Sequence, residues 1–165
     1  MDLFGGSKHW NADDWTASDD RVRGGKSQSY FDCSDSKSIG RFHGDLDIKA
    51  LGGAGFASQR TTGEDRVWDL SAYAGIEVQV AEADGKHYTF ILKDELLPRN
   101  PENGREQATI SYEYDFGTET VARAKGMRVF IPWKALKPTY RGKEKKDASA
   151  IDLKNVKRMS IMMRR

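Results

Sequence analysis

One stretch in the middle of the chain constrains the fold more than any other. Residues 76–80 read Ile-Glu-Val-Gln-Val, which is the alternation of a strand with one buried and one solvated face. Residues 87–93 are more continuously apolar, as expected in the interior of a sheet. Between the two segments, Asp84 and Gly85 suit a tight turn, because this pair tolerates positive φ. The pattern predicts a central β-hairpin.

Strand-like patterns recur along the rest of the chain, and no long helical pattern interrupts them. The segment 56–61 is expected to be the hairpin partner of 42–51, residues 137–150 form a basic loop, and 152–156 form one helical turn. Many short strands separated by turns predict an all-β fold, a β-sandwich or barrel of the jelly-roll kind. The other expected strands are residues 28–32, 108–116, 127–133 and 158–163.

Length and composition predict one domain. The 165 residues, 38% of them hydrophobic, are enough to bury a proper core, so we expect a single domain over residues 1–165. Residues 1–14 form a polar N-terminal extension, in which Trp10, like the following Trp15, is expected to pack as a structural aromatic. The lone Cys33 excludes an internal disulfide and fits a reducing compartment.

The targeting signals that the sequence lacks also limit its location. No apolar run approaches the roughly 18 residues that a membrane span needs. The N-terminal residues carry neither a secretion signal nor a mitochondrial address. We therefore expect a cytoplasmic protein, and a mitochondrial one only if a transit peptide has been removed.

The charge is balanced overall but uneven along the chain. A net charge of +2 creates no global field, so a nucleic-acid partner is not expected. Residues 134–165, however, hold eleven Lys or Arg against three Asp or Glu. This basic C-terminal edge is either a solvated surface or the docking surface for an anionic partner, and the sequence leaves both readings open.

The residue types that carry catalysis are scattered. His9, His43 and His87 lack metal-ligand spacing, and neither a nucleophile elbow nor a phosphate-binding or dinucleotide-binding glycine loop is present. We predict no catalytic residue, no metal site and no cofactor, and interpret the carboxylate pairs as surface charge. These pairs are Asp19-Asp20, Asp94-Glu95 and Glu102 with Glu106. A structural calcium is the one alternative kept, with Asp32, Asp35, Asp45 and Asp47 as candidate ligands.

Six short motifs, in order, give the chain a resemblance to a known family. They are residues 18–27 (SDDRVRGGKS), 53–60 (GAGFASQR), 68–76 (WDLSAYAGI), 88–93 (YTFILK), 131–133 (IPW) and 141–143 (RGK). In this order they resemble the complex I intermediate-associated protein 30 family. The resemblance implies a galactose-binding-like jelly roll. It also implies an assembly factor that holds intermediates of respiratory complex I and is not itself a redox protein.

The family-matching segments also supply candidates for a ligand groove. They are Asp20, Ser27, Ser58, Arg60, Lys93 and Trp133. Arg60 is favoured, because a planar guanidinium clamps a carboxylate or sugar hydroxyls with two parallel hydrogen bonds. The alternatives are an internal salt bridge from Arg60 to Asp20 or Asp94, and a core position for Trp133.

These observations together favour a non-catalytic, chaperone-like binding or assembly protein that acts by protein–protein contact. The basic C-terminal edge and the Gly24-Gly25 turn are the candidate contact surfaces. Two alternatives remain. One is a small-molecule or carbohydrate-binding jelly-roll module, and the other is a cofactor-free, redox-neutral enzyme that uses the same groove.

Overall fold

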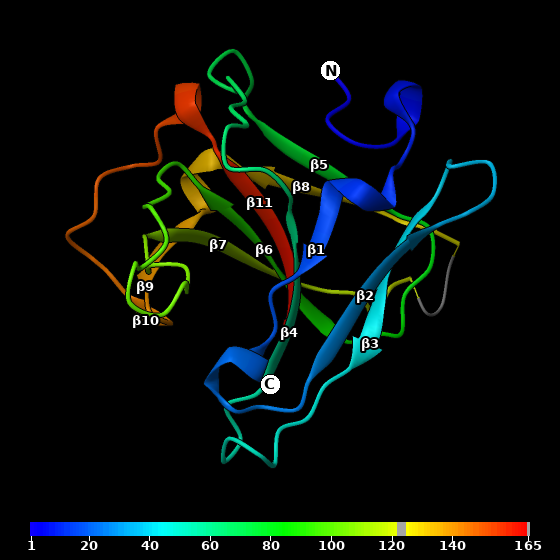
Figure 1. Cartoon of the computed structure of the whole chain (residues 1–165). Coiled ribbons are helices and arrows are strands. Elements are labelled where there is room, and N and C mark those ends of the chain that lie inside the picture. The colour runs from blue at the N-terminus through cyan, green and yellow to red at the C-terminus, as the bar shows by residue number, and fades with distance from the viewer. Residues whose placement is uncertain (122–124, 165) are drawn as a thin grey trace. The chain divides into compact units, whose positions relative to one another are not determined.

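The computed structural model describes residues 1–121 and 125–164, and this part of the chain is built from strands (Figure 1). It contains eleven β-strands and five short 3-10 turns, and no α-helix occurs among the described residues. The strands pair antiparallel. The all-β prediction is therefore confirmed. The chain divides into two compact units, residues 1–62 with 160–165 and residues 63–159, while the single domain stays a prediction.

In the first unit, one strand pairs with a neighbour on each side, and two other strands form a separate hairpin. β4 pairs with β1 on one edge and with β11 on the other, and β2 pairs with β3 (Figure 1). The strands are β1 (Trp15–Ala17), β2 (Gln28–Cys33), β3 (Gly40–Asp45), β4 (Phe56–Thr61) and β11 (Arg158–Arg164), whose residues from Ser160 belong to this unit. The 3-10 turns are η1 (Gly6–Lys8), η2 (Ala12–Asp14) and η3 (Asp20–Arg23).

Four aromatic rings tie the N-terminal residues to this unit. The ring of Trp15 lies 5.0 Å from that of Phe4 and 5.1 Å from that of Phe31, centroid to centroid, and Trp10 lies 5.6 Å from Phe31. Such contacts stabilise by more than the buried area alone. Gly40 leaves room for them, since a Cβ there would meet Phe31 and Trp10 at 2.6 and 2.8 Å. Trp10 and Trp15 are thus structural, as expected.

Four strands of the second unit pair antiparallel one after another, and two others form a separate two-stranded sheet. The four strands are in the order β6-β7-β9-β10, and the separate sheet pairs β5 with β8. Their bounds are β5 (Gly75–Val80), β6 (His87–Lys93), β7 (Ser111–Gly117), β8 (Met127–Pro132), β9 (Lys137–Tyr140) and β10 (Lys143–Glu144). Two 3-10 turns, η4 (Trp133–Ala135) and η5 (Leu153–Asn155), complete it. The latter matches the predicted helical turn.

The predicted central hairpin is wrong, although both of its strands exist. β5 pairs with β8 along Gly75–Val80, whereas β6 pairs with β7, so the two consecutive strands lie in different sheets. Alternation is a local property of one strand and does not identify the partner. The six residues between β5 and β6 are also longer than the two-residue turns that fix a tight hairpin.

Two further sequence-based expectations need correction. The strand expected at 42–51 is β3, which ends at Asp45, and its partner is β2 rather than the segment 56–61. The basic loop at 137–150 contains the β9–β10 hairpin, whose strands are joined by Arg141 and Gly142. By contrast, β6 is buried at four consecutive positions, 89–92, as its continuous apolar sequence predicts.

Candidate functional site

The two adjacent carboxylates at positions 19 and 20 form a buried polar network in the first unit. Asp20 is fully buried: its Oδ1 accepts a hydrogen bond from the Ser27 amide at 3.0 Å. Its Oδ2 accepts from the Ser27 hydroxyl at 2.8 Å and from the Phe56 amide at 2.9 Å. The Ser27 hydroxyl in turn accepts from the Asp47 amide at 3.0 Å. Asp20 thus connects the chain before β2 with the start of β4.

Asp19 connects the same two strands from the other side. Its Oδ2 accepts from the Ser29 amide and its Oδ1 from the Ser58 amide, both at 2.8 Å. The Ser29 hydroxyl donates to the Ser58 carbonyl at 2.8 Å and accepts from Gln59 Nε2 at 2.9 Å. β2 and β4 do not pair with each other as strands, so these side chains supply the hydrogen bonds that a ladder would otherwise make.

Two glycines make the close approach to Asp20 possible. A Cβ at Gly25 would lie 2.3 Å from Asp20 Cγ, and a Cβ at Gly55 would lie 2.0 Å from the Asp47 carbonyl oxygen and 3.1 Å from Asp20 Oδ2. No side chain fits at these distances. The Gly24-Gly25 turn therefore packs against Asp20, and its second glycine has a structural role.

The interpretation of Asp19-Asp20 as surface charge is wrong. Asp19 is 6% exposed and Asp20 is completely buried. The local sequence shows two carboxylates but not the amide donors, which come from residues as far as 39 positions away in the chain. The signal that sequence reasoning missed is the combination of this pair with the alternating serines Ser27 and Ser29, which the structure turns inward.

Three of the predicted ligand-groove residues belong to this network. Asp20, Ser27 and Ser58 are 0%, 0% and 2% exposed. Asp20 accepts hydrogen bonds from Ser27 and from the Phe56 amide, and the Ser58 amide donates to Asp19. Their observed contacts hold the fold together, and a ligand-binding role for them stays a prediction.

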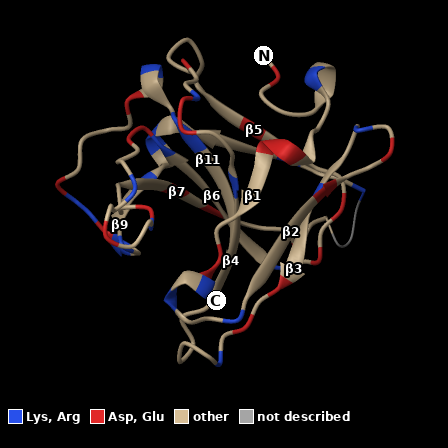
Figure 2. Cartoon of the chain, viewed as in Figure 1, with Lys and Arg blue, Asp and Glu red and all other residues tan. Residues whose placement is uncertain are grey.

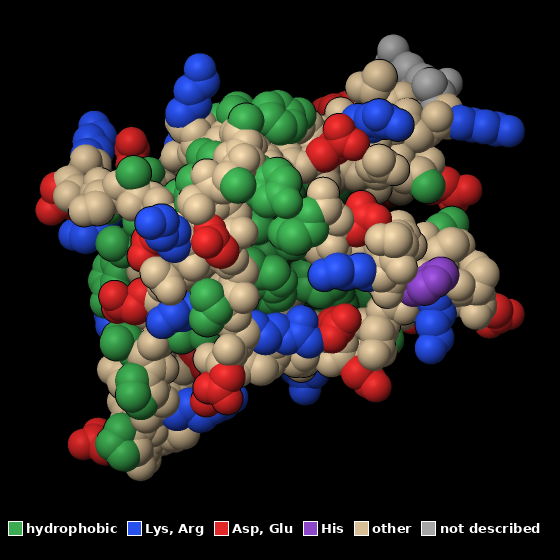
Figure 3. All heavy atoms as spheres, turned by 90° about the horizontal axis from the view of Figure 1, so that it is seen from above, with side chains coloured by type: hydrophobic (Ala, Val, Ile, Leu, Met, Phe, Trp, Pro, Cys, Tyr) green, Lys and Arg blue, Asp and Glu red, His purple; other side chains and the backbone are tan. Residues whose placement is uncertain are grey.

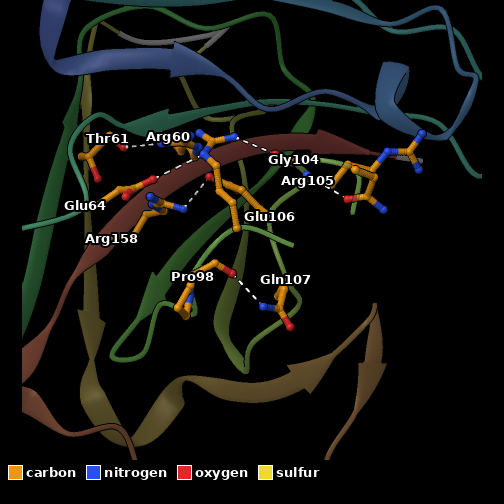
Figure 4. A network of polar contacts seen from close by, with 11 residues as sticks. Arg60, Thr61, Glu64, Pro98, Gly104, Arg105, Glu106, Gln107 and Arg158 are labelled. Atoms are coloured by element: carbon orange, nitrogen blue, oxygen red, sulfur yellow. Dashed lines mark hydrogen bonds and ion pairs between the residues drawn. The ribbon is translucent and has the colours of Figure 1, made fainter. Parts of the chain in front are cut away.

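The other three predicted residues make hydrogen bonds of their own. Arg60, in β4, is half-buried, and its Nη1 donates to the carbonyl of Thr61 at 3.1 Å (Figure 4). In the second unit, Lys93 Nζ donates to Thr109 Oγ1 at 3.0 Å, and Trp133 Nε1 donates to the Tyr73 carbonyl at 2.6 Å. Each side chain is anchored at one end to its own unit.

An ion pair that the sequence did not predict lies in the second unit. Arg158 Nη1 contacts Glu106 Oε1 at 3.0 Å, with the Arg158 side chain 7% and the Glu106 side chain 37% exposed (Figure 4). Such a pair mainly prevents an uncompensated buried charge. The neighbouring loop is held by Gln107, whose Nε2 donates to the Pro98 carbonyl at 2.7 Å. Sequence spacing gives no signal for a pair 52 residues apart.

The structure separates the residues considered for calcium. Asp32 and Asp45 lie at opposite ends of the β2–β3 hairpin, where they face Arg41 and Gln28. Among residues 1–121 and 125–164, no group of three or more His, Cys, Asp or Glu is arranged to hold a metal ion. The structural calcium stays a prediction, because main-chain carbonyls also bind this ion.

Asp32 instead binds two side chains of β3. It accepts from Arg41 Nε at 3.1 Å and Nη2 at 3.0 Å, and its Oδ2 lies 2.7 Å from His43 Nε2. The hydrogen bonds from Arg41, and then from His43, hold the pKa of Asp32 below its ordinary value. The ring of His43 also stacks on Tyr30, with centroids 5.4 Å apart. This exposed cluster fastens the two strands of the hairpin.

The basic C-terminal edge contains one well-defined element, the β9–β10 hairpin. Tyr140 pairs with Lys143, and the two residues between them have positive φ, 51° at Arg141 and 78° at Gly142. This is the backbone of a type I′ turn. The Arg141 guanidinium lies 5.5 Å from the centre of the Tyr140 ring. Figure 2 shows Lys and Arg gathered at this end of the second unit, with single acidic residues among them.

The described chain is all-β, buried carboxylates connect its strands, and it presents a basic hairpin. The family model of "Complex I intermediate-associated protein 30" matches residues 3–165, and the chain belongs to this family. It is also similar to an uncharacterized protein of Schizosaccharomyces pombe, with 43% identity over 165 residues, 98% of this chain and 74% of the relative. No described helix is long and apolar enough to cross a membrane.

Proposed function

We propose that this chain is a non-catalytic binding protein that acts by contact with another protein, as an assembly factor. The observation that carries the proposal is the match of residues 3–165 to a family named for association with a complex I intermediate. An assembly intermediate of respiratory complex I is therefore the first partner to test.

The distribution of side chains supports this proposal. The carboxylates of Asp19 and Asp20, the Ser27 hydroxyl and the main-chain amide of Ser58 form hydrogen bonds within the chain itself, so they stabilise the fold. The surface in Figure 3 intersperses acidic and basic side chains with apolar ones. A reversible protein interface has about the same apolar fraction as the rest of a protein surface, so a mixed surface of this kind is compatible with reversible protein contact.

The test is recovery of the partner by the tagged chain. We expect a tagged wild-type chain, purified from cells that build complex I after mild cross-linking, to enrich complex I subunits about tenfold or more over a tagged unrelated protein. The control is the tagged Gly55→Ala variant, because the new methyl group disturbs the Asp20 network. It measures how much nonspecific binding a damaged fold causes. Failure of the wild-type chain to enrich complex I subunits over the unrelated protein would contradict the proposal.

A second candidate, carbohydrate binding, is favoured by one observation in the second unit. Phe130 and Tyr73 are 53% and 43% exposed, and a Cβ at Gly75 would lie 2.7 Å from Phe130 Cζ, so this ring covers the glycine. Exposed rings are stacking surfaces for sugars. A thermal-shift screen against glycans tests it: a ligand at one hundred times its Kd stabilises by about 2.7 kcal/mol. Loss of a hit in Phe130→Ala would support this second function.

A further inference from the structure

We propose that the β9–β10 hairpin is the docking surface for an acidic segment of a partner protein. This inference rests on the proposed function and deepens it, because it assigns the protein contact to one element and gives the chemistry of the partner. The hairpin and the two residues that follow it, residues 137–146, carry five Lys or Arg and one Glu. An anionic segment is the complement of such a surface.

The cations of the hairpin are available at its surface. Lys137, Arg141, Lys143 and Lys146 are exposed, whereas Lys145 is half-buried and lies 3.3 Å from Asp147. Four of the five cations are therefore exposed to solvent. Charges of this kind steer an oppositely charged partner and fix its orientation.

The tip of the hairpin combines an aromatic ring with two of these cations. Tyr140 is 38% exposed, and the Arg141 guanidinium lies 5.5 Å from its ring centre. Lys143 is directly opposite Tyr140 in the register, which places the two side chains on the same face of the hairpin. Tyr and Arg are the residues most enriched among those that dominate binding energy in protein interfaces.

The backbone at Arg141 is a second, independent observation. Position 141 has φ 51°, and Gly142 has φ 78°. Type I′ turns strongly prefer Asn, Asp or Gly at the first of these positions, because a Cβ atom crowds the following carbonyl oxygen there. Gly has no Cβ, and Asn and Asp offset the strain by local hydrogen bonds. An arginine held in this conformation points to a use of the guanidinium outside the fold, since strain of this kind concentrates at binding sites.

A protein segment fits this surface better than a nucleic acid. Glu144 and Asp147 lie within or beside the hairpin and interrupt its cations, whereas a phosphate backbone carries a negative charge at every nucleotide. A peptide segment can place uncharged residues opposite these two carboxylates. β10 also forms the last strand of its sheet among the described strands, with β9 on one side only. Its outer edge offers main-chain groups to an extended peptide. The loop behind it is fixed, because the Tyr112 hydroxyl donates to the Ser149 carbonyl at 2.9 Å.

The binding test uses the full chain and a fluorescent peptide of ten residues that alternates Glu with Gly and Asp. We expect salt-sensitive binding that Arg141→Glu with Lys143→Glu weakens about tenfold or more. Lys125→Glu, an exposed cation of the same unit outside the hairpin, is the matched single-charge control and changes Kd less than about twofold. Arg141→Asn removes the charge at this position and keeps a residue that suits the turn. Weaker peptide binding by this variant is therefore due to the lost charge and not to a damaged hairpin.

Each outcome decides the proposal. Equal peptide binding by wild type and the double variant would overturn it. Tighter binding of single-stranded DNA or of phosphatidylserine vesicles than of the peptide, at the same salt, would also overturn it and identify the other anionic partner. If the double variant still recovers complex I subunits as wild type does, this inference fails and the proposed function stands. If wild type recovers no complex I subunits, the proposed function fails. The peptide titration alone then shows whether the hairpin binds an acidic segment.

Discussion

Asp19 Oδ1 accepts a hydrogen bond from the amide of Ser58 at 2.8 Å, which fastens the start of the chain to a strand 39 residues further on. The other oxygen of the same carboxylate accepts from the Ser29 amide. One buried side chain thus satisfies main-chain donors of two strands that do not pair with each other. We regard this network as the structural centre of the first unit, since it joins β2, β4 and the preceding loop.

Removal of the Asp19 carboxylate is expected to destabilise the protein strongly. Asp19→Ala leaves two buried amides without acceptors, each at about 1–3 kcal/mol, so the free energy of unfolding should fall by about 2–4 kcal/mol. Urea unfolding followed by tryptophan fluorescence measures it. Asp35→Ala, at an exposed carboxylate of the same unit, is the control and should change stability by less than about 0.5 kcal/mol. Equal midpoints for the two variants would refute the assigned role of Asp19.

A methyl group at Gly55 is expected to disturb the neighbouring Asp20. In Gly55→Ala the new Cβ meets the Asp47 carbonyl at 2.0 Å, so the main chain must move, at about 2–3 kcal/mol. Gly52→Ala is the comparison, because it strains a position at φ 63° but meets no atom within 4 Å. It should lose only about 1 kcal/mol. The expected order of melting temperatures is wild type, Gly52→Ala and then Gly55→Ala, and the reverse order of the two variants is the contrary result.

Arg141→Asn is expected to stabilise the protein. Asparagine adopts positive φ more readily than arginine, so the hairpin turn should gain about 0.5–1 kcal/mol. Differential scanning calorimetry should show a small rise in melting temperature. Arg141→Val is the opposing control, because a β-branched residue is strained there and carries no charge. A lower melting temperature for Arg141→Asn than for wild type would show that the guanidinium stabilises the folded hairpin itself.

The β2–β3 hairpin is expected to weaken in acid through Asp32. The ordinary pKa of an aspartate carboxyl is 3.8. In the folded chain the hydrogen bonds from Arg41, and then from His43, lower the pKa of Asp32 below this value. Because the folded pKa is the lower one, the stabilisation is present above about pH 3.8 and is lost as the pH falls through the folded value. The stability difference between wild type and Asp32→Asn should therefore shrink from about pH 6 to about pH 2.5. A difference that stays constant over this range would contradict the assignment.

The sequence predicted the strands well and their partners poorly. The alternation in residues 76–80 and the apolar run in 87–93 identify β5 and β6, because side-chain period is a local property. Their partners, β8 and β7, are chosen by packing across the whole sheet. The β9–β10 hairpin was missed because its strands are short and charged, although Arg141-Gly142 marks the turn between them.

The sequence selected some residues of the buried network but assigned them another role. The motif resemblance predicted Asp20, Ser27 and Ser58 as ligand-groove residues, and the structure brings all three into one buried network. That they are buried depends on amide donors contributed by distant strands, which local sequence does not specify. The Arg158–Glu106 pair was not predictable for the same reason.

The central claim is that the chain acts by protein contact. The most direct test is the apparent mass of the species in which the chain is found in cells. Native gel electrophoresis of mildly solubilised cells, followed by detection of the tagged chain, measures this. We predict that a substantial share of the chain migrates in discrete species far above 18.6 kDa that contain complex I subunits and differ from the finished complex. Migration of the whole pool at the mass of the free chain, with the same result after cross-linking, would contradict the account.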